Sequence, residues 1–201
     1  MLAGLILAGG KSSRMGTDKS LLCLPDSQQS LLEHHQKQLS LVCEQNIFIS
    51  GSQHAQGIAD IFPSCGPLSG IHAAITHILL HHSNITELLV IAVDMPDLCS
   101  DDYNYLLKMG RENNCLCSFK NCFLPLYITI SCELTKYLAK VFNHHPDETL
   151  MQPKQQQYSV KMMLDSLNGL QVQPFKDTQL NNINTAVQWQ KRCAKHLYNE
   201  A

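Results

Sequence analysis

A glycine-rich stretch directly after the first apolar run is the feature that most constrains the fold of this chain. Residues Leu5–Lys19 have the sequence LILAGGKSSRMGTDK, in which Leu5–Leu7 is typical of the end of a buried strand. Two glycines, Gly9 and Gly10, follow this run at once. Three cations lie in the same stretch: Lys11, Arg14 and Lys19. Because glycine has no Cβ, backbone N–H groups can converge on an anion, and the cations can neutralise its charge. The stretch therefore predicts a strand that ends in a phosphate-binding loop.

The spacing of the glycines separates this loop from two common phosphate-binding motifs. The P-loop pattern is absent, and so is the dinucleotide pattern G-x-G-x-x-G. The pattern present is L-A-G-G-x-S-x-R-M-G-x-D-K, which resembles the signature loop of the nucleoside-triphosphate transferases. It is most similar to the loop of the molybdenum cofactor guanylyltransferases, which attach GMP to molybdopterin. A plain glycine turn with incidental surface charges is the alternative interpretation.

The composition argues against several other classes of protein. The length of 201 residues predicts one domain with a full core, or at most two small ones. The formal net charge of -2 argues against nucleic-acid binding. No apolar run has the length of a membrane span, and the N-terminus lacks the charged region and cleavage site of a signal peptide. We therefore expect a cytoplasmic protein without nucleic-acid or membrane partners, whose nine cysteines are free thiols.

The cysteines and histidines raise the question of a second metal site. Cys115, Cys117 and Cys122 have the spacing C-x-C-x4-C, which matches no common zinc pattern, so we expect them to be buried strand thiols. Adjacent histidine pairs occur at 34–35, 81–82 and 144–145. Neighbouring helical residues point about 100° apart and chelate poorly. We expect these pairs on solvated helix surfaces or at helix ends.

Strand-like and helix-like segments alternate along the chain, which predicts a single three-layer α/β/α domain of Rossmann-like type, residues 1–201, with a mostly parallel sheet. The predicted strands are Ala3–Ala8, Asn46–Ser50, Ile58–Phe62, Leu88–Val93, Cys115–Phe119, Phe123–Ile130 and Leu170–Pro174. The predicted helices are Ser30–Cys43, Ile71–His82, Asp101–Arg111 with Ser100 as N-cap, Glu133–Phe142, Lys161–Leu167 and Ala186–Leu197. A polar loop is predicted over Asn143–Tyr158.

Three polar features follow predicted strands and should face one cleft, because ligands bind outside the carboxyl ends of the strands in open α/β sheets. They are the first glycine loop, the segment Ser50–Ser52 and Asp94. Asp94 ends an apolar strand, where a carboxylate costs desolvation unless a cation pairs with it. Magnesium bound to triphosphate oxygens would be such a cation, whereas a turn-forming or helix-capping aspartate is the structural alternative. We assign Asp97 a structural role.

The resemblance to the guanylyltransferases extends to further motifs. D-M-P at Asp94 resembles the family's metal-binding D-x-P, and Gly66–Gly70 resembles its G-P-L-x-G loop around the nucleotide. Asp60 aligns loosely with a nucleotide-binding aspartate, and Ser50 stands where close relatives carry asparagine. The nucleotide-binding residues that the resemblance implies are Leu7, Ala8, Gly9, Gly10, Lys19, Ser50, Asp60, Gly66, Pro67, Leu68, Gly70 and Asp94.

Two asparagines near the C-terminus, Asn182 and Asn184, belong to an N-x-N-T motif that the resemblance assigns to molybdopterin binding. Capping of the last helix by Asn184 or Thr185 is an equally good interpretation. The family's histidine before a proline and its later arginine pair are missing. Leu124 stands before the proline instead, and Lys154 and Lys161 are the only cations in the later region.

The resemblance implies GMP transfer from GTP to the terminal phosphate of molybdopterin, with pyrophosphate as leaving group. Arg14, Lys19 and Asp94 are the implied catalytic residues, and Asp94 would hold Mg²⁺. Transient contacts with proteins that deliver molybdopterin or mature molybdoenzymes are also implied. L-A-G-G and D-M-P favour guanine over cytosine. A transferase that uses CTP or another phosphorylated acceptor, and a nucleotide-binding relative with impaired turnover, are the alternatives.

Overall fold

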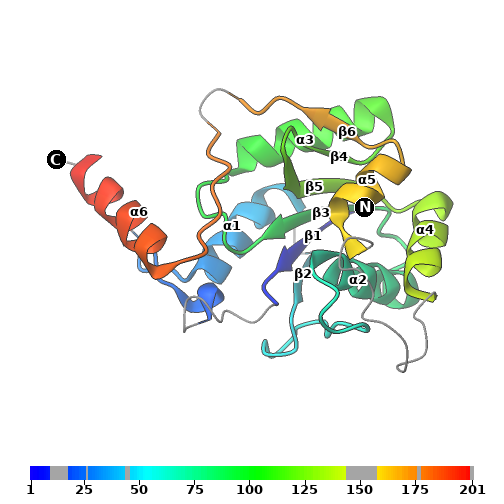
Figure 1. The fold of residues 1–201 in the computed structure, drawn as a ribbon, viewed down its shortest axis with the longest axis horizontal. Coiled ribbons are helices and arrows are strands. Elements are labelled where there is room, and N and C mark those ends of the chain that lie inside the picture. Colours follow the sequence, from blue (N-terminus) through cyan, green and yellow to red (C-terminus); the bar gives the residue numbers. More distant parts are fainter. Residues whose placement is uncertain (10–17, 26, 44–45, 144–157, 176–177, 200–201) are drawn as a thin grey trace.

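The computed structural model describes the chain except for residues 10–17, 26, 44–45, 144–157, 176–177 and 200–201. Its centre is a six-stranded sheet with the order β2-β1-β3-β5-β4-β6 (Figure 1). The strands are β1 (Leu2–Leu7), β2 (Ile47–Ser50), β3 (Glu87–Ala92), β4 (Cys117–Phe119), β5 (Cys122–Thr129) and β6 (Leu170–Val172). Strand β5 runs antiparallel to both of its neighbours, while the other pairings are parallel. The prediction of a mostly parallel sheet is confirmed.

Helices cover both faces of this sheet, as the alternation of segments predicts. They are α1 (Leu31–Cys43), α2 (Pro67–His81), α3 (Ser100–Asn113), α4 (Cys132–Asn143), α5 (Val160–Ser166) and α6 (Ala186–Asn199), with a short 3₁₀ helix η1 (Lys19–Leu21). Alternate strand residues face opposite sides. Leu5 and Val90 pack with α2, α4 and α5, whereas Ile6 and Ile91 pack with α1 and α3. The three-layer α/β/α architecture is confirmed.

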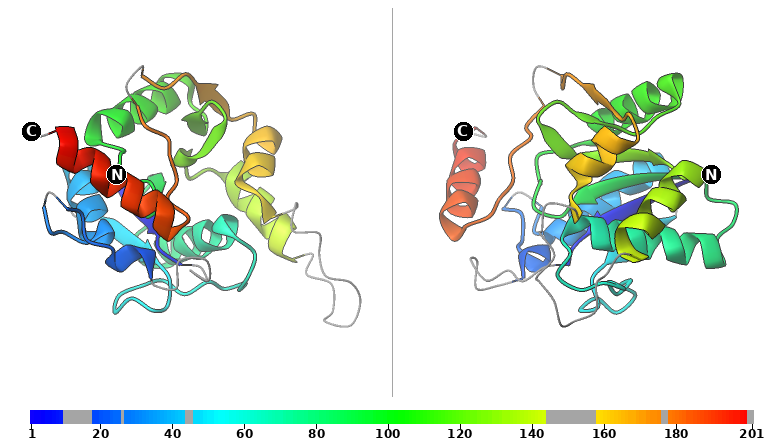
Figure 2. Two further views of the ribbon diagram at one scale, coloured as in Figure 1. Left: turned by 60° about the vertical axis from the view of Figure 1, so that its left-hand side comes forward. Right: turned by 45° about the vertical axis from the view of Figure 1, so that its right-hand side comes forward.

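Helix α6 lies at the periphery of the domain, joined to β6 by an extended segment (Figures 1 and 2). It ends the chain on the side away from α4 and α5 in both figures. The segment before α6 returns to the carboxyl end of β3, because the N–H of Ile183 donates to the carbonyl of Asp94 at 2.8 Å. Ile183 is buried there. The C-terminal part of the chain thereby contributes to the same sheet edge as the first strands.

Three local predictions are wrong. Ile58–Phe62 is not a strand, because Ile58 makes only an isolated bridge to Ser50. Helix α2 begins at Pro67 rather than at Ile71, since Gly66 adopts a positive φ of 70° and Pro67 takes the first helical turn. Ser100 is the first residue of α3 and not its N-cap. The cap is Cys99, whose backbone N–H donates to the Asp102 carboxylate.

The predicted free thiols are confirmed, since all nine cysteines are unbridged. Cys117 is buried in β4, and Cys115 and Cys122 are half-buried. The described residues contain no group of three or more histidine, cysteine or acidic side chains that could hold a metal. The pair at 144–145 lies outside the described residues. Among the described helices, none is long and apolar enough to cross a membrane.

The prediction of a solvated surface position is wrong for His35. This side chain is fully buried in α1, and its Nε2 lies 3.2 Å from the carbonyl oxygen of Val93. The contact ties α1 to the residue directly before Asp94. Burial, with the neighbouring His34 adding to it, lowers the pKa of His35 to about 3. The folded protein therefore holds this imidazole neutral.

This buried imidazole predicts a loss of stability in mild acid. Between its ordinary pKa and about 3 the unfolded chain binds a proton that the folded chain does not, so stability rises with pH in this window. His35 should lower the free energy of unfolding by roughly 1 kcal/mol between pH 7 and 5.5. His35→Gln keeps an N–H donor but does not titrate, and its urea unfolding should show a correspondingly weaker pH dependence. The same pH dependence in both proteins would contradict the prediction.

Candidate functional site

Asp94 occupies the turn that follows β3, at the carboxyl edge of the sheet. The buried residues Met95 and Pro96 come next, and the Asp94 side chain is 16% exposed. Its Oδ2 accepts a hydrogen bond from the ammonium of Lys19 at 3.0 Å. Its Oδ1 is buried and has no hydrogen-bond partner among the described residues. Lys19 is thus a cation that pairs with this carboxylate, as expected for a carboxylate after an apolar strand. The Oδ1 oxygen stays available for a further ligand.

Lys19 is presented by the short helix η1, directly after the glycine loop. Asp18 caps this helix, because its Oδ1 accepts from the N–H of Ser20 at 2.9 Å and from the Ser20 hydroxyl at 2.8 Å. Ser20 is fully buried, so the turn is anchored in the core. The Lys19 Nζ makes a second hydrogen bond at 2.7 Å to Oδ1 of Asn184. The two residues of the D-K pair therefore have different roles. Asp18 stabilises the turn, and Lys19 places its ammonium beside Asp94.

The N-x-N-T segment gives each of its polar residues a different role. Thr185 caps α6, because its hydroxyl accepts from the N–H of Gln188 at 3.2 Å. The Oε1 atom of Gln188 in turn accepts hydrogen bonds from the backbone N–H groups of Thr185 and Asn184. The Asn184 side chain is left to bind Lys19. Of the two interpretations of this motif, capping belongs to Thr185, while Asn184 joins the site.

A second group of predicted residues meets around Ser50, at the end of β2. Ser50 is buried, and partial burial raises the pKa of Asp60 against the opposing effect of the nearby Ser50 side chain. A Cβ on Gly70 would lie 2.5 Å from Ser50 Oγ, and one on Gly9 would lie 3.8 Å from it. Four residues of the predicted nucleotide site are thereby brought together by the fold.

The remaining predicted nucleotide-binding residues lie in four different surroundings. Gly66 and Pro67 form the N-terminus of α2, and the Cβ position of Gly66 faces open space. Leu68 is fully buried in the core, so any contact with a nucleotide is left to its backbone. Leu7 and Ala8 lead into the loop, and the Ala8 carbonyl accepts from the Gln53 side chain at 2.9 Å. Gly10 and Arg14 lie outside the described residues.

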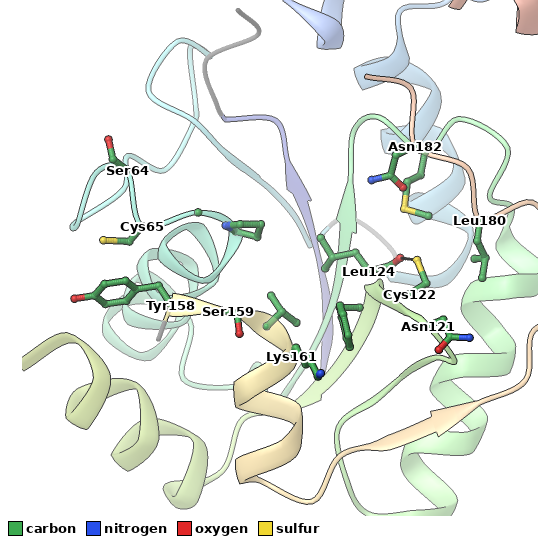
Figure 3. A pocket seen from close by; sticks show the side chains of 15 residues that line it. Ser64, Cys65, Asn121, Cys122, Leu124, Tyr158, Ser159, Lys161, Leu180 and Asn182 are labelled. Atoms are coloured by element: carbon green, nitrogen blue, oxygen red, sulfur yellow. Dashed lines mark hydrogen bonds between the residues drawn. The ribbon is translucent and has the colours of Figure 1, made fainter. Parts of the chain in front are cut away.

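A cavity of about 780 Å³ opens beside this group of residues (Figure 3). Its walls come from the loop before α2, the turn after β3, the β4–β5 hairpin, α5 and the segment before α6. The lining residues are Ser64, Cys65, Gly66, Pro67, Met95, Asn121, Cys122, Phe123, Leu124, Tyr158, Ser159, Val160, Lys161, Leu180 and Asn182. Figure 3 shows Asn182 and Asn121 on one side and Cys65 and Tyr158 on the other. The ammonium of Lys161 is the charged group among these side chains.

The cavity wall contains residues that sequence reasoning did not select. Leu124, which precedes a cis proline, and Cys122 come from β5, and Leu180 comes from the segment after β6. Leu124 and Lys161 stand near the places of the family's missing histidine and arginines. This departure from the family pattern was the sequence signal that could have identified them as cavity residues. Cys122 and Leu180 carry no motif, because apolar and thiol side chains at these positions resemble ordinary core residues. Of the two C-terminal asparagines, Asn182 lies in the cavity wall, while Asn184 does not.

The close packing at Gly70 predicts opposite results for two glycine substitutions. Gly70→Ala forces its Cβ against Ser50 Oγ at 2.5 Å and Leu7 Cδ2 at 3.0 Å. The overpacking should outweigh the better helix propensity of alanine, lowering the free energy of unfolding by about 1–2 kcal/mol. Gly9→Ala meets no atom of the described residues closer than 3.5 Å and should change the free energy of unfolding by less than about 0.5 kcal/mol. Urea unfolding of both variants is the measurement, and equal losses would contradict the assigned packing.

Comparison with known proteins places this site in a family. Residues 4–168 match the MobA-like NTP transferase domain. A molybdenum cofactor guanylyltransferase from Xanthomonas euvesicatoria is 31% identical over 94% of this chain and 92% of its own length. A probable molybdenum cofactor guanylyltransferase from Rhodopirellula baltica is 37% identical over 56% of this chain and 57% of its own.

Solved structures share the fold. The molybdopterin-guanine dinucleotide biosynthesis protein A from Archaeoglobus fulgidus is similar with a TM-score of 0.69, 21% identity, and coverage of 99% of this chain and 100% of that one. A nucleotidyl transferase from Methanothermobacter has a TM-score of 0.64 and 16% identity, with 99% of each chain covered. At these identities the likeness concerns the fold alone. The family match and the full-length relative from Xanthomonas identify the chain as a member of the MobA-like nucleotidyltransferases.

Proposed function

We propose that this protein transfers GMP from GTP to the terminal phosphate of molybdopterin, giving molybdopterin guanine dinucleotide and pyrophosphate. The observation that carries the proposal is the Lys19–Asp94 pair, in which Lys19 follows the glycine-rich segment in sequence and Asp94 directly precedes Met95 of the cavity wall. One side of the pair offers the phosphate-binding elements, and the other offers room for an acceptor. The guanylyltransferases from Xanthomonas and Rhodopirellula support guanine as the base and the molybdenum cofactor as the acceptor.

The nucleotide half would be formed by the loop after β1, the Ser50–Asp60 pair and the N-terminus of α2. Gly9 allows the backbone to approach the phosphates, and the N-terminus of α2 presents the positive end of its helix dipole to an anion. The acceptor half would be the cavity, where Asn182 offers both a donor and acceptors to a pterin edge. Gly66, Pro67 and Met95 border both halves.

The reaction needs positioning and charge neutralisation rather than a covalent nucleophile. An oxygen of the acceptor phosphate attacks the α-phosphorus of GTP, one P–O bond forms, and the bond to the departing pyrophosphate breaks. Lys19 would stabilise the charge that grows on the phosphate oxygens. Arg14, which lies outside the described residues, would share this role on the basis of the loop motif alone.

The donor set fits magnesium, which the reaction would require. Asp94 Oδ1 is buried without a hydrogen-bond partner among the described residues, while Oδ2 is engaged by Lys19. Magnesium in nucleotide sites is commonly held by one or two carboxylates together with substrate phosphates and water. When bound, the ion would supply charge neutralisation and a template for the phosphates. Asp94 would hold it, and its fixed place at the end of β3 would keep the ion beside Lys19.

A different acceptor is the second candidate, and the charge of the cavity favours it. Lys161 is the only charged residue in the described lining, and it stands in a region where the guanylyltransferases usually carry an arginine pair. The altered lining would suit another phosphorylated acceptor, or would weaken molybdopterin binding. Supplying GTP and Mg²⁺ with molybdopterin, and separately with sugar phosphates, and measuring released pyrophosphate distinguishes these functions. Release only with molybdopterin supports the proposal, and release only with a sugar phosphate overturns it.

Removal of the Asp94 charge should abolish transfer without unfolding the protein. Asp94→Asn keeps the shape of the side chain but weakens both the metal site and the pair with Lys19. The rate of pyrophosphate release should fall at least about a hundredfold, with the far-ultraviolet circular dichroism unchanged. Asp101→Asn, on the exposed first turn of α3, is the matched control and should stay within about threefold of the parent. An Asp94→Asn enzyme as active as this control would refute the assignment.

The choice of base is tested by thermal stability in the presence of nucleotides. GTP with Mg²⁺, at about a hundred times its dissociation constant, should raise the free energy of unfolding by about 2.7 kcal/mol. For a chain of this size the melting temperature should rise by about 5–10 °C. ATP and CTP at the same concentration should shift it much less. Equal shifts for all three nucleotides would remove guanine selectivity and leave only the transferase assignment.

A further inference from the structure

We propose that Asn184 is a positioning residue for Lys19, acting on the nucleotide side of the reaction rather than on the acceptor. The inference rests on the proposed nucleotidyl transfer and assigns a role within it. Its basis is the hydrogen bond of 2.7 Å between Lys19 Nζ and Asn184 Oδ1, which is shorter than the 3.0 Å contact of Lys19 with Asp94. These three residues come from the beginning, the middle and the end of the chain.

The ammonium of Lys19 has three N–H donors, and two of them are engaged by these contacts. Its side chain is 17% exposed, and the third donor has no partner among the described residues. An ammonium held in two directions can offer its remaining donor only within a narrow range. Lysine has a flexible four-carbon side chain, and ordering it on phosphate binding costs conformational entropy. The two contacts already restrict the Lys19 side chain before the phosphate binds, which lowers this cost.

Asn184 is itself held from both sides. Its own N–H donates to Gln188 Oε1 at 2.7 Å, within the cap of α6. The N–H of the preceding residue, Ile183, donates to the Asp94 carbonyl at 2.8 Å, and the Ile183 side chain is buried. The backbone around Asn184 is thereby tied to the same turn that carries Asp94. The carboxamide oxygen has a defined place beside the Lys19–Asp94 pair.

The surroundings of the two asparagines differ, which separates their roles. Asn182 is exposed and lies in the wall of the large cavity, where an acceptor would bind. Asn184 is half-buried, is not part of that wall and contacts Lys19. An assignment of both residues to the acceptor side therefore fits Asn182 only. We retain Asn182 for the acceptor and place Asn184 with the nucleotide machinery.

A double-mutant cycle between Lys19 and Asn184 tests this role. The parent, Asn184→Ala, Lys19→Ala and the double variant are compared for Mg²⁺·GTP affinity without acceptor, and for kcat and KM in pyrophosphate release. Asn184→Ala should lower kcat/KM for GTP about tenfold in the parent, as expected for loss of a charged hydrogen bond. In the Lys19→Ala background it should lower Mg²⁺·GTP affinity less than about twofold, since the residue it positions is gone. The KM for the acceptor should stay within about twofold.

A matched control and a readout that needs no turnover complete the test. Asn181→Ala changes the same residue type in the same segment, and Asn181 is exposed and bonded only to Gln179 in the described structure. Asn184→Ala should raise the rate at which acetic anhydride acylates Lys19, measured by mass spectrometry, whereas Asn181→Ala should not. This labelling holds whichever substrate the enzyme uses, so failure of the proposed reaction leaves it valid.

Two outcomes would overturn the assignment. One is that Asn184→Ala lowers Mg²⁺·GTP affinity by the same factor with Lys19 present and with Lys19→Ala, while among the kinetic constants only the KM for the acceptor rises. The other is unchanged Lys19 acylation in Asn184→Ala. Either result would return Asn184 to the acceptor side or to a purely structural role.

Discussion

The ion pair between Lys19 and Asp94 is the interaction on which the arrangement of this site depends. It joins the end of the glycine loop to the end of β3 across a parallel pair of strands, β1 and β3, that are adjacent in the sheet. Parallel strands end at the same edge, so a residue after each strand meets the other without a long reach. The aspartate would be costly to bury alone, and the lysine offsets that cost while leaving one carboxylate oxygen unpaired among the described residues.

Elements outside the motifs hold this pair in place. His35, buried in α1, contacts the carbonyl of Val93, and Ile183 donates to the carbonyl of Asp94 itself. The turn after β3 is therefore fastened by α1 and by the segment before α6, two parts of the chain with no phosphate-binding signature. The neutral imidazole and the backbone hydrogen bond hold this turn without adding a charge next to the carboxylate.

Much of the fold and of the nucleotide half could be predicted from the sequence, because their causes are local. An apolar run followed by glycines predicts a strand and a loop wherever it occurs, and Asp94 stands out because its neighbours are apolar. Contacts that depend on long-range folding could not be predicted. The interpretation of His35 as a surface residue was wrong, because it followed the adjacent histidine pair and not the i, i+4 spacing that puts His35 on one face of α1 with Leu31 and Leu39. The meeting of Asn184 with Lys19 spans 165 positions in the sequence and has no periodicity to reveal it.

The place of Asn184 in the chain has a consequence for biosynthesis. The family match ends at residue 168, and the sheet is complete with β6, yet the second partner of Lys19 is supplied only by the segment after it. A ribosome-bound chain that has folded its sheet still lacks this partner of Lys19, and it also lacks the hydrogen bond from the Ile183 N–H to the Asp94 carbonyl. Maturation of the proposed nucleotide site would thus be tied to translation of the C-terminal segment, and a prematurely terminated product would keep the recognisable domain while lacking the second partner of Lys19.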